Sequence, residues 1–157
     1  MTRRASSSAR VVCALALVLV LGGCAATVTL MPASLDTDAK RFSPPPDKAN
    51  LYLTRTSSLG VAVLFQVYLD GKLAGSVAPD TYLLFEVEPG KHQVSVITEE
   101  SQAALTVDAA PGGNYFVNVV PKFGWQHARA GLEELARDDG VKAVREAKRA
   151  EGLNLRP

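Results

Sequence analysis

The chain has 157 residues, a formal net charge of +1 and 47% hydrophobic residues, with only two cysteines and two histidines. This near-neutral balance does not supply the basic face that nucleic-acid binding needs, so no nucleic-acid partner is expected. The length suffices for one hydrophobic core, which predicts a single globular domain.

Residues 1–23 have the pattern of a bacterial lipoprotein signal peptide. Three arginines precede an apolar run over residues 11–20, and the letters LGGC place small residues directly before Cys24. Cleavage would leave Cys24 as the new N-terminus, carrying fatty acyl chains. Two or more such chains hold a protein stably on a membrane without a span. We therefore expect lipid attachment at Cys24.

An uncleaved membrane anchor is the alternative, because residues 11–30 contain no charge and a span needs about 20 residues. The glycines and small residues after position 21 weaken that alternative. Residue 25 is Ala rather than Asp, which favours the outer membrane, facing the periplasm. Removing the signal takes away three arginines, which changes the formal charge from +1 to −2, and also removes Cys13. With Cys24 acylated, no thiol remains for a disulfide, a metal or a nucleophile.

Residues 24–48 mix Thr, Ser, Asp and Pro, end near the triplet PPP and show no sustained period. They are predicted to form a flexible, proline-rich tether.

Residues 49–150 show short β-branched and aromatic runs separated by turn residues, the pattern of an all-β, antiparallel β-sandwich of about seven to eight short strands. Phe65, Val67 and Leu69 alternate with polar neighbours. Asp70-Gly71 predicts a type I′ hairpin turn. The expected strands are 50–55, 61–69, 72–77, 82–88, 92–98, 103–109, 115–120 and 129–135.

One C-terminal helix is predicted over residues 141–150, followed by a tail at 151–157. Two aspartates precede the helix and bases lie near its end, as the helix dipole prefers. Lys142, Arg145 and Arg149 would share one stripe. That stripe could meet an anionic surface, although a solvated face is the favoured interpretation.

The strings QVYLDGKLAG (66–75), EPGKH (88–92), GNYFV (113–117) and LEEL (132–135), with Tyr82, resemble the bacterial family known as domain of unknown function 2846. More distantly they are similar to PEGA-type β domains of cell-surface proteins. The resemblance covers roughly residues 50–144. It implies a β fold on a lipoprotein, and it carries no established functional residues to this chain.

No catalytic motif, metal-ligand spacing or phosphate-binding glycine loop is present in the sequence, so no enzyme activity, metal or cofactor is expected. His92 is interpreted as an edge imidazole that completes a hydrogen bond. Glu86 and Glu88 share a strand face and could form an acid pair for glycan hydrolysis, but an exposed sheet face has this pattern anyway. Glu99 and Glu100 are interpreted as solvated turn residues.

The segment PKFGWQH (121–127) is the one dense aromatic and basic cluster outside the expected strands. Its residues Lys122, Phe123, Trp125 and His127 form the candidate binding loop. Alternatively, the aromatics cap one end of the sandwich. We expect a membrane-anchored, non-enzymatic binding or accessory lipoprotein of the cell envelope, with an envelope protein or a glycan as partner. The alternatives are a structural subunit that pairs through its sheet edges and a wall-glycan hydrolase.

Overall fold

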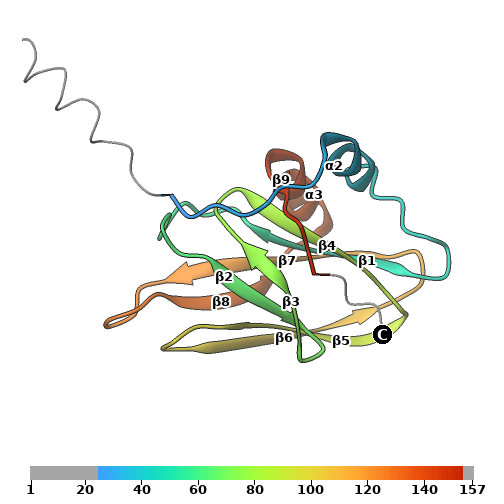
Figure 1. The fold of residues 1–157 in the computed structure, drawn as a ribbon. Coiled ribbons are helices and arrows are strands. Elements are labelled where there is room, and N and C mark those ends of the chain that lie inside the picture. The colour runs from blue at the N-terminus through green and yellow to red at the C-terminus, as the bar shows by residue number, and fades with distance from the viewer. Residues whose placement is uncertain (1–24, 154–157) are drawn as a thin grey trace, which may run out of the picture.

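The computed structural model describes residues 25–153, so Cys24 and the predicted signal over 1–23 lie outside the described residues. Two sheets pack face to face, with strand orders β8-β7-β1-β4-β9 and β3-β2-β5-β6. Helices α2 and α3 cover the outer face of the five-stranded sheet (Figure 1). The predicted β-sandwich is confirmed. Its elements are α2 (Ala33–Ala39), β1 (Ala49–Arg55), β2 (Phe65–Leu69), β3 (Lys72–Val77), β4 (Thr81–Val87), β5 (Gly90–Ile97), β6 (Gln102–Ala109), β7 (Asn114–Lys122), β8 (Arg129–Glu134), α3 (Arg137–Glu146) and β9 (Lys148–Arg149).

The main core lies between the two sheets and follows the predicted alternation. Phe65, Val67 and Leu69 of β2 are buried, whereas Gln66 between them is exposed. Residues 83, 85 and 87 of β4 face the same core. Side chains that alternate along a strand point to opposite faces, which is why this pattern could be read from the sequence.

The turn between β2 and β3 also follows the prediction. Asp70 has φ 51° and Gly71 has φ 78°, the positive values that a type I′ turn requires at both central positions.

The five-stranded sheet is mixed rather than wholly antiparallel. β1 pairs antiparallel with β4 but parallel with β7, and β4 pairs parallel with β9. After β6 the chain crosses from the four-stranded sheet to the five-stranded sheet, where β7 runs parallel to β1. All seven residues of β1 are buried, because this strand has a sheet on one face and helices on the other.

The prediction of an unstructured tether over residues 24–48 is wrong for its described part. Residues 33–39 form α2, and Tyr52 donates a hydrogen bond of 2.7 Å to the carbonyl oxygen of Ala39 at its end. A helix of seven residues has little stability of its own, so the sheet beneath it supplies what the local sequence does not.

The C-terminal helix begins and ends earlier than predicted, at residues 137–146 instead of 141–150. Asp138 and Asp139 therefore lie inside its first turn, where the dipole favours them. Arg149 lies beyond the end of the helix, in β9, where it pairs with Tyr82 of β4. It therefore shares no helical stripe with Lys142 and Arg145.

The predicted tail is also wrong for residues 151–153. Gly152 bridges Gly75, and the N–H of Leu153 donates to the carbonyl oxygen of Ala74 at 2.8 Å. These backbone bonds add the segment to the edge of β3.

Candidate functional site

Three loops gather at one end of the sandwich, which we call the loop end: residues 56–64, 98–101 and 123–128. They connect β1 to β2, β5 to β6 and β7 to β8, and all lie at the left side of Figure 1. The predicted binding residues Phe123, Trp125 and His127 belong to the third loop, and Lys122 is the last residue of β7 before it. The fold therefore presents the four predicted site residues at this end.

Glu100 holds the third loop in place from the neighbouring turn. Its carboxylate accepts backbone N–H bonds from Trp125, Gln126 and His127 at 2.8, 2.6 and 2.8 Å, and from Nε of Arg129 at 3.1 Å. The backbone bonds from Gln126 and His127 contribute most to lowering the pKa of Glu100 to about 2. Glu100 therefore stays ionised and keeps three consecutive amides in one conformation.

Gly124 allows the loop to approach this carboxylate. A Cβ atom at position 124 would overlap the carbonyl oxygen of His127 and the carboxylate of Glu100. Any larger residue would force the backbone away from Glu100, so this position requires glycine in the observed conformation.

The aromatic side chains of the loop point into solvent. Phe123 is 84% exposed and Trp125 is 88% exposed, so neither caps the sandwich. His127 lies 3.0 Å from Glu99 through its Nε2. The two aromatic side chains therefore leave apolar area in solvent on a backbone that Glu100 fixes.

Arg55 shapes the first loop from inside the molecule. It is fully buried, its guanidinium lies 4.7 Å from the ring centroid of Phe65, and it donates to the carbonyl oxygens of Leu59, Gly60 and Val63. The same residues form a turn, because the Val63 N–H donates to the carbonyl oxygen of Gly60 at 2.9 Å. This explains why β2 begins at residue 65 and not at residue 61, where the sequence pattern placed its start.

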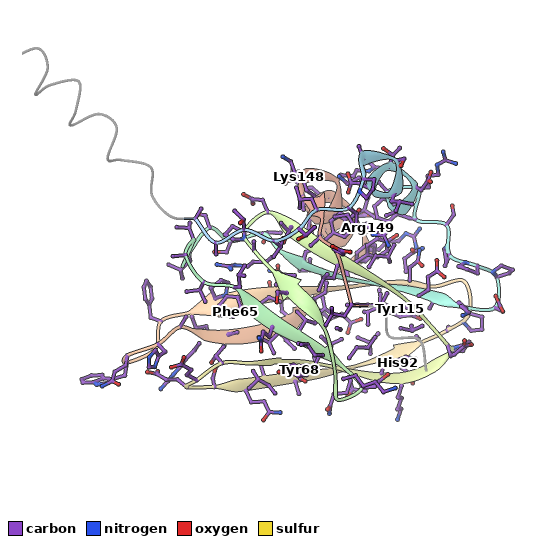
Figure 2. The ribbon with its side chains drawn as sticks, viewed as in Figure 1. Phe65, Tyr68, His92, Tyr115, Lys148 and Arg149 are labelled. Carbon is purple, nitrogen blue, oxygen red and sulfur yellow. The ribbon has the colours of Figure 1, made fainter. Side chains whose placement is uncertain are left out.

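A pocket of about 250 Å³ lies between the first and third loops. Phe65 lines it, and Figure 2 shows Phe65 on the loop side of the sandwich with His92 toward the opposite end. Its other lining residues are Leu59, Gly60, Pro121, Lys122, Phe123, Gly124, Gln126, His127 and Ala128. The pocket is small and open, so it adds contact area beside Trp125.

A second pocket of about 470 Å³ lies at the edge of β3, between residues 27–29 and 151–153. Glu151 is the one titratable residue that lines it. This set offers no pair of acid and base for catalysis.

The sequence predicted an edge imidazole at His92 that completes a hydrogen bond. The edge position is wrong, because β5 is an interior strand of its sheet, but the ring is hydrogen-bonded. Nδ1 lies 2.7 Å from Asp70 Oδ2, and Nε2 lies 2.7 Å from the carbonyl oxygen of Glu88. Partial burial opposes the charged form, but these two acceptors outweigh it and raise the pKa of His92. His92 thus connects the turn between β2 and β3 to the turn between β4 and β5, at the end of the sandwich opposite the loop end.

The acid pair at Glu86 and Glu88 lies on an exposed face, and Glu88 pairs with Lys48 at 3.2 Å. Within residues 25–153, no cluster of three or more His, Cys, Asp or Glu side chains is placed to hold a metal ion. No helix of that range is long and apolar enough to cross a membrane.

Sheet edges are partly covered. The edge of β3 is occupied by residues 152–153 and that of β9 by residues 30–31, through a bridge from Leu30 to Ala150 and a 2.9 Å bond from the Met31 N–H to the Arg149 carbonyl. Two of the four edges are therefore closed to strand addition by a partner.

Sequence reasoning missed Glu100 and Arg55 as organisers of the loop end. Glu100 was interpreted as turn solvation, which is wrong, because its partners lie 25 to 29 residues away. Arg55 closes an expected strand and carries no local sign of burial. The one available signal was Gly124 between two aromatics, which hints at a close backbone approach.

Two comparisons with known proteins found matches to this chain. The family described as "Protein of unknown function (DUF2846)" matches residues 45–131, a range that contains all three loops of the loop end. An uncharacterized protein of Haemophilus influenzae is 34% identical over 127 residues, which cover 80% of this chain and 75% of that protein. The chain belongs to the DUF2846 family.

Proposed function

We propose that this protein is a lipid-anchored lipoprotein of the cell envelope, on the periplasmic side of the outer membrane, whose β domain is a non-enzymatic contact module. The observation that carries the proposal is the exposure of Phe123 and Trp125 on a backbone held by Glu100. Aromatic side chains of this kind dominate binding energy at interfaces. A loop that is already ordered loses little conformational entropy when it binds.

The course of the chain before the domain supports lipid attachment over an uncleaved span. The N–H of Ala26 donates to the carbonyl oxygen of Val61 at 2.9 Å, so the β domain begins to hold the chain at residue 26. A span would then be limited to residues 11–25, which as a helix extend about 22 Å. The hydrocarbon core of a bilayer is about 30 Å thick. An acylated Cys24 needs no such length.

The anchor is tested with Cys24→Ala in the full chain. We expect the variant to lose metabolic labelling by a fatty acid and to remain at precursor length, because acylation precedes signal removal in this pathway. Fractionation of the parent protein between inner and outer membranes tests the location. Labelling of the variant at the parental level would refute the anchor.

The contact surface is tested by photocrosslinking in intact cells from a photoreactive phenylalanine analogue at position 123. We expect discrete adducts that disappear when Gly124→Ala is added, because that change displaces the loop and leaves its aromatics present. The same analogue at Leu35, an exposed position on α2, is the matched control. Equal adducts from both positions would refute a dedicated surface.

A further inference from the structure

We propose that the partner of the loop end is the lipid bilayer itself. Phe123 and Trp125, together with the apolar side chains of the first loop, lie in the interface of the membrane that holds the acyl chains of Cys24. This inference rests on the proposed lipid anchor, and it assigns the contact surface a defined partner.

Covalent geometry brings the loop end to the membrane. The N–H of Ala26 donates a hydrogen bond to the carbonyl oxygen of Val61 in the first loop, and Cys24 is two residues earlier in the chain. Two residues of extended chain span about 7 Å. Because residues 29–31 are also held, by pairing with residues 149–151, the segment after Ala26 provides no slack. An anchor at Cys24 therefore holds this end, and not the His92 end, against the lipid.

The first loop presents an apolar surface that suits lipid. Residues 56–64 contain no charged side chain. Leu59, Val61 and Leu64 are each more than a third exposed, at 38, 47 and 41%. Trp and Phe beside such residues match the composition of protein surfaces at the boundary between headgroups and acyl chains, where an aromatic ring reaches apolar and polar surroundings together.

The charges of the loop end balance and do not attract an anionic surface. The bases beside its third loop are Lys122 and Arg129, and the acids of its second loop are Glu99 and Glu100. Arg129 is already paired with Glu100. Contact with lipid should therefore be apolar in origin, and it should depend little on salt or on anionic lipids.

Trp125 is the one tryptophan of the chain, so its fluorescence reports on this surface directly. The acylated mature protein, which begins at Cys24, is purified from membranes and reconstituted into phosphatidylcholine vesicles made with or without lipid brominated in the acyl chains. We expect a blue-shifted emission in vesicles and loss of its intensity with brominated lipid. Both effects should persist when phosphatidylglycerol is added and when the salt concentration is raised.

The matched control is the double variant Trp125→Phe with Leu35→Trp, which moves the fluorophore to α2, away from the loop end (Figure 1). Its emission should be quenched by aqueous iodide and not by brominated lipid. If both proteins respond equally to brominated lipid, or if Trp125 responds only to iodide, the membrane contact is refuted.

Fatty-acid labelling of the same preparation separates this inference from the proposed function. A labelled protein with an aqueous Trp125 refutes the membrane contact alone. A protein without label refutes the anchor and the membrane contact together.

Discussion

Two carboxylates, Asp36 under the helices and Glu100 at the loop end, each gather hydrogen bonds from distant parts of the chain. Asp36 accepts from the Tyr82 hydroxyl at 2.7 Å, from the N–H of Arg149 at 3.0 Å and from Lys40 Nζ at 2.8 Å. Glu100 accepts from three backbone amides and from Arg129. The surroundings of the two groups differ. Asp36 lies over a layer of buried aromatics, whereas Glu100 supports aromatics that face solvent.

This difference distinguishes aromatic side chains that stabilise the fold from aromatic side chains that are exposed on a loop. Tyr52 and Phe116 are fully buried beneath the helices and stack with ring centroids 5.2 Å apart. Phe123 and Trp125 are exposed to solvent, although the backbone amides of residues 125–127 are hydrogen-bonded to Glu100. We infer that the first aromatic set stabilises the fold and that the second is held for contact with another surface.

The largest expected effect is in the buried set. Phe116→Ala should lower the free energy of unfolding by about 3–5 kcal/mol, because it opens a cavity between β7 and α3, where Gly140 abuts the ring. The matched control Phe123→Ala should change it by less than about 0.5 kcal/mol. Urea unfolding of both variants measures the contrast. Similar losses at both sites would abolish the distinction.

Asp36→Ala should cost about 1–3 kcal/mol at neutral pH, because the Tyr82 hydroxyl and the Arg149 amide lose a charged acceptor. Asp38→Ala on the same helix is the control. Its carboxylate lies 3.3 Å from Arg41 with both side chains more than half exposed, so about 0.5 kcal/mol or less is expected.

The Asp36 effect should depend on pH in a defined direction. Burial opposes its ionisation, but hydrogen bonds from Lys40 and Tyr82 outweigh burial and lower the pKa below 3.8. The stabilisation is therefore fully present above 3.8 and is lost as the pH falls through the lower folded value. Urea unfolding should therefore show that the difference in free energy of unfolding between the parent and Asp36→Ala narrows as the pH falls below 3.8. A gap that widens with acid would contradict the assignment.

Glu100→Gln should act locally. We expect faster hydrogen exchange at the amides of Trp125, Gln126 and His127, because a neutral amide oxygen accepts more weakly than a carboxylate. The Glu99→Gln variant should leave their exchange unchanged. Since the pKa of Glu100 is lowered from 4.5 to about 2, protection in the parent protein should persist over that interval and disappear below it. Loss of protection near 4.5 would contradict this geometry.

The smallest expected change in stability is for Trp125→Ala, at less than about 0.5 kcal/mol, because the side chain is already in solvent. Thermal unfolding followed by circular dichroism measures it without relying on tryptophan emission. A loss of 3 kcal/mol or more would mean that the ring is buried, and it would remove the contrast between the two aromatic sets.

Local pattern was sufficient for most of the strands and for one turn. The alternation around Val67 and Leu83 and the Asp70-Gly71 pair are short-range signals, because side-chain direction and turn geometry repeat over two to four residues. The same reasoning failed for α2. Its seven residues carry no clear period, and the contacts that stabilise it come from Tyr52 and Tyr82 in the sheet.

The sequence predicted which residues form the candidate loop, but it did not predict which residues hold the loop in place. Its aromatic and glycine content indicated a contact surface, and its residues all lie at one end of the sandwich. The roles of Glu100 and Arg55 could not be predicted, because their partners are set by which loops meet at that end.

The sequence by itself determined the β-sandwich, the inward face of its strands and the aromatic composition of the loop, because each depends on neighbours along the chain. The tertiary structure decided the parallel pairing of β1 with β7, the helix in the expected tether and the exposure of Trp125. Each of these depends on contacts between segments far apart in sequence. Their free energy is gained only when burial and hydrogen bonding are satisfied together, which no local pattern records.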